Sequence, residues 1–402
     1  MASTTSLTER KYIVPFIFVT SLFMLWGIAI TLGEALNRNF QNVLKIKPSE
    51  SALVQFSIFG AYAVMAIPAG LFMKRFGYKY GAVFGLLLYA VGAFMFIPSA
   101  NAGSFLFFRI SLFVLACGLA TLETVAHPFI ASMGHQDTSD QRINFAQSFN
   151  GLGTVIGPLL GGLIILEGTA QEQSLESVKI LYTVIGSVIF VLAISFAFVK
   201  VPALTDHHDA VDDKVAAKSH GSLWQHKHFI WAAIAQFFNV AAQGGTWAFF
   251  INYGAQTQGL PDEQASYYFG LSAALMMVGR FLGTFLMRFI PPNKLLAIAA
   301  FMNIVMCIIV AQNFGWPSFI ALILINFFFS IMFPTIFSLG LKNLGPHTKQ
   351  ASSYIVMGVV GGAIFPFLMG LIADHDIAAA YYLPIICYVV IMLFGWRLYK
   401  PR

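Results

Sequence analysis

The chain has 402 residues, of which 58% are hydrophobic and only 10% are charged. Because soluble proteins carry about 25% charged residues, this composition excludes a soluble domain and predicts an all-α polytopic membrane protein. The formal net charge of +6 is small and thinly spread, so it indicates a topology signal rather than a nucleic-acid surface.

The hydrophobic pattern predicts twelve transmembrane helices, each of roughly 20 mostly apolar residues. The chain opens with the polar residues MASTTSLTERKY. The apolar run after them is too long for the core of a signal peptide, so we interpret it as a retained first span. The predicted spans cover about residues 12–36, 52–73, 79–99, 104–133, 143–166, 176–200, 228–253, 265–289, 294–312, 316–341, 349–373 and 378–398.

A long polar stretch, VPALTDHHDAVDDKVAAKSHGSLWQHKH, separates the sixth predicted span from the seventh. It is the natural linker between two halves of six spans each. The sequence therefore predicts an N-terminal six-helix bundle over residues 1–200, a cytoplasmic linker over 201–227 and a C-terminal six-helix bundle over 228–402.

The distribution of Lys and Arg predicts the orientation, because these residues accumulate in cytoplasmic loops. Placing the N-terminus in the cytoplasm puts most of the 23 Lys and Arg residues on the cytoplasmic side. Both termini and the linker are then cytoplasmic, while Arg109 and Arg280 fall within spans and receive no substrate role. Outside lie Arg38, Lys45, Lys47 and Lys179.

The two halves repeat each other in order and at nearly constant offsets. GLFMKRF at Gly70 to Phe76 is similar to GTFLMRF at Gly283 to Phe289, and HPFIASMG is similar to FPTIFSLG. The third match pairs Gly153, Pro158, Gly162, Leu163 and Ile164 with Gly361, Pro366, Gly370, Leu371 and Ile372. Glycine and proline are common in membrane spans, so one match could arise by chance, but three matches in order make chance a poor explanation. A parallel repeat of six spans is typical of the major facilitator fold, in which two bundles enclose a site near the middle of the membrane.

Two acids lie within predicted spans, Glu34 and Glu123, while the other acids fall in termini or loops. An acid at the bilayer centre costs at least about 2.5 kcal/mol on insertion scales, so it is rarely accidental. A buried carboxyl group that is protonated in one conformation and ionised in another would couple a proton to transport. The alternatives are that Glu34 reaches interfacial water and that Glu123 only bonds to a neighbouring helix.

His127 lies four residues after Glu123 and on the same helix face. Three interpretations stay open: a hydrogen-bond partner of Glu123, a sugar ligand, or a packed neutral histidine. We predict no metal site, because Glu123 and His127 supply only two ligands. The three cysteines also lack metal-ligand spacing, and we predict no disulfide between them.

Neutral polar residues gather in several spans, with an aromatic residue among them. Amides offer donors and acceptors without charge, and a tryptophan ring offers a flat apolar face, a combination that suits a polyhydroxylated ligand. The alternative is that these amides join helices to one another, which is common in membrane bundles. The substrate-binding candidates are Thr31, His127, Gln147, Asn150, Asn239, Gln243, Trp247 and Asn326.

The motifs LETVAHPF, RINFAQSFN, GRFLGTFLMRF and FPTIFSLGLKNLGPHTKQASSYIVM carry a family resemblance. On them, nearly the whole chain resembles the fucose:proton symporter subfamily of the major facilitator superfamily, which includes glucose/galactose porters. In GLFMKRFGYKYG, Lys74 stands where the superfamily usually has an aspartate, a departure that is itself similar to this subfamily.

The resemblance implies sugar uptake by alternating access, driven by a proton gradient. It implies that Glu123 is the coupling glutamate and that Glu34 stands where the fucose symporter has its other coupling carboxylate, an aspartate. It also implies that four of the polar and aromatic candidates face the cavity: Gln147, Asn150, Gln243 and Trp247.

Other positions depart from the fucose symporter. His127 replaces an Asn, Asn252 replaces an Arg, and Phe333 replaces a Tyr. These differences make a hexose such as glucose or galactose, or an amino sugar, at least as well supported as fucose. They also leave the coupling ion open between H+ and Na+.

The expected function is therefore a proton-coupled monosaccharide symporter with no enzymatic activity. The alternatives are a sodium-coupled symporter and, with less support, a multidrug exporter of the same fold, a sensor or an intramembrane enzyme. The expected partners are a small-molecule sugar and the lipid bilayer, with no nucleic acid and no cofactor besides the coupling ion. We expect a monomer in a bacterial inner (plasma) membrane.

Overall fold

The computed structural model describes residues 8–134, 139–167, 174–201, 222–287, 289–342, 344, 351, 354–355 and 357–400. Within these ranges the chain is helical and contains no strand, which confirms the prediction of an all-α protein for this part. The predicted linker falls largely on residues 202–221, outside the described residues, so the proposed domain boundaries stay a prediction.

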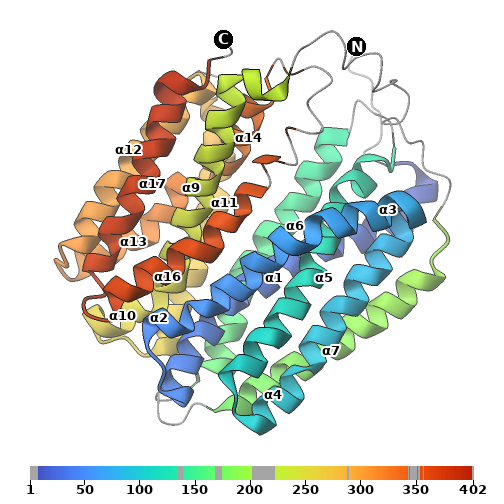
Figure 1. The fold of residues 1–402 in the computed structure, drawn as a ribbon, viewed down its shortest axis with the longest axis horizontal. Coiled ribbons are helices and arrows are strands. Elements are labelled where there is room, and N and C mark those ends of the chain that lie inside the picture. Colours follow the sequence, from blue (N-terminus) through green and yellow to red (C-terminus); the bar gives the residue numbers. More distant parts are fainter. Residues whose placement is uncertain are drawn as a thin grey trace.

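The first half of the chain folds into long helices joined by short turns (Figure 1). Its elements are η1 (Arg10–Tyr12), α1 (Ile13–Leu44), α2 (Pro48–Ser51), α3 (Leu53–Phe94), α4 (Phe96–Ala102), α5 (Phe105–Ala131), α6 (Ser139–Leu160), η3 (Gly161–Ile165) and α7 (Leu175–Phe198).

The second half contains more interrupted helices. Its elements are η4 (Leu223–Gln225), α9 (Lys227–Ala248), α10 (Phe250–Gln258), α11 (Asp262–Leu286), α12 (Pro292–Ala311), α13 (Trp316–Phe329), α14 (Met332–Gly340), η6 (Gly358–Val360), α16 (Gly361–Ala373), η7 (Ala379–Tyr382), α17 (Leu383–Leu393) and η8 (Phe394–Leu398).

The described helices are consistent with twelve spans. By length and composition, eight of them are able to cross a membrane, or nine if one bent pair counts as a span. The second predicted span lies in α3, and the third covers the rest of α3 and the start of α4; α3 itself is interrupted at Gly77 with φ 84°. That left-handed backbone is open to glycine at no steric cost, so GYKYG turns the chain between the two spans.

Two predicted spans of the second half are each built from two helices. α9 stops at Ala248 and α10 starts after Phe249, while α13 and α14 are separated by Ser330 and Ile331. Carbonyls freed at such breaks need donors, because hydrocarbon supplies none. Other helices supply them.

Three side chains donate to these carbonyls. The Asn37 amide donates to the Ala248 carbonyl at 2.6 Å, and the Tyr381 hydroxyl donates to the Thr246 carbonyl at 3.2 Å. At the second break, Nε of Arg280 donates to the Ser330 carbonyl at 3.4 Å. Arg280 therefore binds a backbone carbonyl inside its own half of the chain.

Glycines bring α1 and α6 into backbone contact. A Cβ placed on Gly153 would lie 2.1 Å from the carbonyl oxygen of Met24, and one on Gly157 would lie 2.1 Å from Oγ1 of Thr31. Such close approach between helices is typical of membrane bundles. The hydrophobic effect does not drive helices together in lipid, and small residues allow the close van der Waals packing that does.

We expect Gly153→Val to lower the thermal unfolding temperature strongly, because the side chain would push α1 from α6. Overpacking of this kind costs about 1–3 kcal/mol or more. Differential scanning fluorimetry in detergent measures the shift. Gly70→Val is the matched control, since nothing lies within 4 Å of a Cβ there; equal shifts for both variants would refute the packing argument.

The two halves touch where α1 ends and α16 ends, at the bottom of Figure 1. A Cβ on Gly370 of α16 would lie 2.7 Å from Cα of Ser49, and one on Gly162 would lie 2.7 Å from the ring of Tyr267 in α11. This end is away from the start of α1 and the end of α17. The molecule is therefore held closed at one end.

Candidate functional site

The carboxylate of Glu123 lies in a polar cluster that four helices build, which we call the Glu123 cluster. Its members are Trp26 of α1, Tyr62 of α3, Glu123 and His127 of α5, and Gln147 of α6. The indole N–H of Trp26 donates to the Tyr62 hydroxyl, and both groups neighbour the Glu123 carboxylate. The acid thus lies among polar groups that can solvate its charge.

His127 connects the acid's helix to α6. Its Nδ1 lies 3.0 Å from the backbone carbonyl oxygen of Glu123, and its Nε2 lies 2.9 Å from Nε2 of Gln147. The edge-to-face ring of Phe23, with centroids 5.0 Å apart, covers one side of the imidazole. His127 thus bonds to the Glu123 backbone and to an amide, and is not simply packed among apolar residues.

Glu123, His127 and Gln147 are only partly buried. Polar and ionisable side chains do not face hydrocarbon without a large cost, so exposed surface on these three groups marks a route for water or ligand inside the protein. Helical spacing predicted that Glu123 and His127 share one helix face, and the structure adds Gln147 of α6, which contacts His127.

Glu34 lies in a different environment. Its side chain is 3% exposed, and its Oε1 accepts a hydrogen bond from the Gln55 amide of α3 at 2.6 Å. The second oxygen, Oε2, has no hydrogen-bond partner among the described residues. A buried charge needs partners for both oxygens, so this environment suits a neutral acid. Glu34 does not reach interfacial water, which was the alternative left open by the sequence.

Two predicted substrate ligands bond to backbone carbonyls in this conformation. Thr31 is fully buried and its hydroxyl donates to the Gly27 carbonyl at 2.9 Å. The Asn150 amide donates to the Phe23 carbonyl of α1 at 3.2 Å. The Thr31 bond stays within α1, whereas the Asn150 bond joins α6 to α1, so the helix-joining role that the sequence left open for the amides describes Asn150 here.

In the second half, Trp247 and Asn326 pair with each other. The indole N–H of Trp247 donates to Oδ1 of Asn326 at 2.8 Å, and the Asn326 amide donates to Ser272 at 3.0 Å. Gln243 is half-buried, whereas Asn239 is buried and neither of its amide atoms has a partner among the described residues. The bonds among Trp247, Asn326 and Ser272 thus lie within the second half, apart from the Glu123 cluster.

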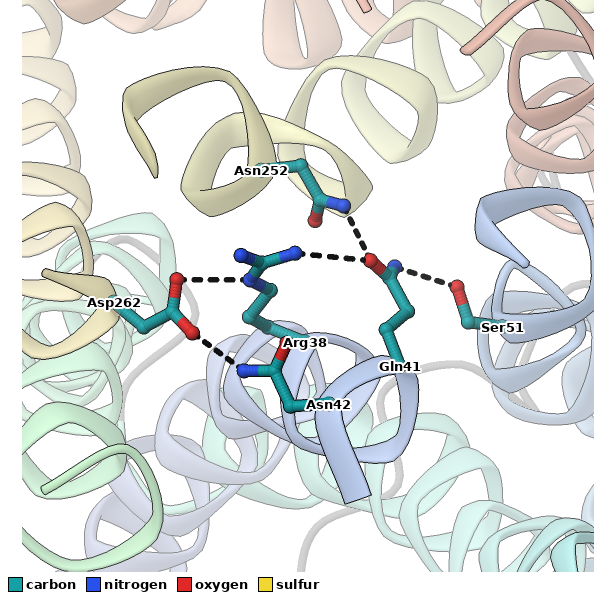
Figure 2. A network of polar contacts seen from close by, with 6 residues as sticks. All are labelled: Arg38, Gln41, Asn42, Ser51, Asn252 and Asp262. Carbon is teal, nitrogen blue, oxygen red and sulfur yellow. Dashed lines mark hydrogen bonds and ion pairs between the residues drawn. The ribbon is translucent and has the colours of Figure 1, made fainter. Parts of the chain in front are cut away.

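A further polar network bridges the two halves at the closed end, and we call it the clasp. Figure 2 shows the Asp262 carboxylate accepting from two N-terminal-half residues: Nε of Arg38 at 2.8 Å and the Asn42 amide at 2.5 Å. Beside them, Gln41 accepts from the Asn252 amide and donates to the Ser51 hydroxyl at 2.7 Å.

A second bridge supports the clasp. Asp374, which follows α16, accepts from the backbone N–H of Ser49 at 3.0 Å and from its hydroxyl at 2.5 Å. In both bridges a carboxylate of the second half accepts two hydrogen bonds from donors in the first half. Asn252, a position singled out by the resemblance, therefore belongs to the closure rather than to the Glu123 cluster.

Sequence reasoning missed the partners of both acids. Trp26 and Tyr62 count as hydrophobic in a hydropathy pattern, so the pattern did not indicate that the Trp26 indole N–H and the Tyr62 hydroxyl form hydrogen bonds. Gln55 is a polar residue near the start of a predicted span, a signal that was present but unused. Among the described residues, no group of three His, Cys, Asp or Glu side chains could hold a metal ion.

Comparison with known proteins identifies the family of this chain. Residues 12–366 match the Major Facilitator Superfamily. The glucose/galactose transporter of Brucella abortus biovar 1 (strain 9-941) is 36% identical over 394 residues, covering 96% of this chain and 95% of the relative. The L-fucose-proton symporter of Escherichia coli (strain K12) is 36% identical over 409 residues, covering 96% of this chain and 93% of the relative.

A solved structure agrees. The crystal structure of the transporter FucP in the outward conformation is similar with a TM-score of 0.70 at 34% identity, covering 98% of this chain and all of that one. The predicted fold is thereby confirmed, and members of this superfamily are secondary transporters rather than enzymes. The chain belongs to the Major Facilitator Superfamily, in the family that includes the L-fucose-proton symporters and the glucose/galactose transporters.

Proposed function

We propose that the protein is a proton-coupled symporter that imports a monosaccharide by alternating access. The relatives that support this are named as a glucose/galactose transporter and an L-fucose-proton symporter. The observation that carries the proposal is the Glu123 cluster, in which an ionisable carboxyl group and the hydrogen-bonding groups of His127 and Gln147 lie together and partly exposed.

This arrangement allows ligand and proton to influence each other. A sugar that binds Gln147 lies near the Glu123 carboxyl, so its binding changes the water and hydrogen bonds around that acid. The protonation state with the lower free energy then depends on whether sugar is bound. Glu34, Glu123 and the eight predicted ligands, Thr31, His127, Gln147, Asn150, Asn239, Gln243, Trp247 and Asn326, are our proposed site; several of them would face the sugar only in another conformation.

The closed end defines the state of the transporter once the membrane orientation is fixed. With both termini cytoplasmic, as the Lys and Arg distribution predicts, the clasp lies on the outer side. The structure then corresponds to an inward-facing state, with Glu34 sealed and Glu123 partly exposed. We further propose a monomer in a bacterial inner membrane, with no nucleic-acid partner, no metal and no cofactor besides the coupling ion.

Uptake of radiolabelled monosaccharides into proteoliposomes tests the function. We expect one sugar among glucose, galactose, fucose and amino sugars to accumulate under an inward proton gradient, without sodium, and an uncoupler to abolish accumulation. Accumulation that requires sodium would replace the proton in the proposal. Transport of lipophilic dyes without any sugar uptake would refute it.

A further inference from the structure

The contacts of His127 determine which of its nitrogens carries a proton. The backbone carbonyl oxygen of Glu123, 3.0 Å from Nδ1, only accepts hydrogen bonds, so Nδ1 must be the protonated nitrogen. A neutral imidazole carries one proton, and its other nitrogen is then an acceptor. Nε2 of His127 therefore presents a lone pair toward Gln147.

This lone pair determines the orientation of the Gln147 amide. An acceptor attracts the amide N–H and repels the amide oxygen, which matches the 2.9 Å contact between Nε2 of His127 and Nε2 of Gln147. Oε1 of Gln147 then points away from the imidazole. No hydrogen bond from a described residue reaches Oε1, and the side chain of Gln147 is only partly buried.

An unused amide oxygen on a partly exposed side chain is a fixed acceptor for a ligand. Building on the proposed function, we propose that His127 is a positioning residue whose Nδ1-protonated imidazole orients the Gln147 amide, so that Oε1 accepts a hydrogen bond from a hydroxyl of the sugar. In place of the direct ligand role predicted from the sequence, His127 then selects the sugar through Gln147 and does not itself touch the sugar.

This role makes a prediction about ligand chemistry. A site that accepts a hydrogen bond from a ligand hydroxyl rejects an analogue without that hydroxyl strongly. A site that binds through apolar contact discriminates between similar ligands much less. One deoxy analogue of the transported sugar should therefore bind the wild type more weakly than the parent sugar does. Gln147→Ala should bind that analogue and the parent sugar with nearly equal affinity. The analogue that behaves in this way identifies the hydroxyl.

Two substitutions of His127 separate its nitrogens. Gln places an oxygen near the position of Nε2 and retains an acceptor for Gln147, whereas Asn reaches only as far as Nδ1. We expect His127→Asn to raise the KM for sugar about tenfold with an unchanged maximal rate and proton-to-sugar ratio, and His127→Gln to restore KM to within about threefold of wild type. Thr124→Ala is the control, because its hydroxyl bonds only within its own helix, to the Ala120 carbonyl at 2.8 Å.

A double variant distinguishes positioning from direct contact. If His127 acts through Gln147, then His127→Asn combined with Gln147→Ala should be no worse than Gln147→Ala alone. If the increases in KM of the two single variants multiplied in the double variant, the proposal would be overturned. An equally high KM for His127→Gln and His127→Asn would also overturn it.

Nitrogen-15 solid-state NMR of histidine-labelled protein supplies a readout that does not depend on transport. Comparison of wild type with His127→Gln assigns the signal, and we expect a protonated Nδ1 and a bare Nε2 at neutral pH. The opposite tautomer would overturn the proposal. If the wild type transports no sugar, the proposed function fails, while the NMR result still decides the geometry of the pair.

Discussion

Glu123→Gln is expected to abolish sugar accumulation against a gradient while leaving sugar exchange across the membrane intact. Gln keeps the size and hydrogen-bonding capacity of a protonated glutamic acid but cannot release a proton. The bundles can then still alternate with sugar bound, yet no proton gradient is converted into a sugar gradient. With one proton per sugar, one pH unit drives roughly tenfold accumulation in the wild type, and the variant should only equilibrate.

Two assays on the same proteoliposomes measure this difference, gradient-driven uptake and counterflow at equal pH. Glu176→Gln is the matched control, since Glu176 is an exposed acid at the start of α7 that pairs with Lys179. We expect the control to accumulate sugar normally. Normal accumulation by Glu123→Gln would show that another group, with Glu34 the first candidate, carries the proton.

Asp262→Ala is expected to open the clasp. The substitution removes the acceptor of both Arg38 and Asn42 and leaves the Arg38 guanidinium largely buried without its counter-charge. Breaking a buried pair in this way costs about 3–5 kcal/mol, and somewhat less here because Arg38 retains some exposure. A loss of about 2–3 kcal/mol would lower the ratio of closed to open molecules at this end roughly 30- to 150-fold.

Pulsed electron paramagnetic resonance measures this population, with spin labels at the exposed positions Lys47 and Gln264 on opposite sides of the clasp. We expect longer distances in Asp262→Ala than in wild type. Glu263→Ala is the control, because this neighbouring acid bonds to Tyr267 in its own helix. An unchanged distance distribution in Asp262→Ala would mean that the packing of Gly370 and Gly162, not the clasp, holds this end closed.

The sequence predicted the helices well because membrane burial imposes a strong and simple pattern. Hydrocarbon requires long apolar helices, so each predicted span contains helix among the residues that the structure describes, and the repeat pointed to the correct superfamily. The interruptions were not predictable in the same way. The break at Phe249 depends on Asn37 and Tyr381, donors from distant parts of the chain that stabilise the freed backbone.

The candidate site was predicted only in part. Helical spacing placed Glu123 and His127 on one face, and their contact with Gln147 follows from the neighbouring helix. Residue type alone does not distinguish an amide that binds a ligand from an amide that joins helices. Asn150 and Asn326 bond to neighbouring helices, while Gln147 retains an unused oxygen, and this difference depends on tertiary contacts alone.

The clasp illustrates a second limit. Arg38, Gln41, Asn42 and Asp262 lie near predicted loops, where charged and amide side chains normally face water. Their pairing arises only because the two halves close over them in this conformation. A sequence describes all states of a transporter at once, whereas the network in Figure 2 belongs to one of them.

Proton movement elicited by sugar tests the central claim most directly. Wild-type protein in liposomes, without sodium and with a pH-sensitive dye inside, should acidify the lumen when the transported sugar is added outside. Glu123→Gln should take up the same sugar by exchange with no change in lumenal pH. Sugar entry in the wild type without acidification would contradict proton coupling and, with it, the assigned role of Glu123.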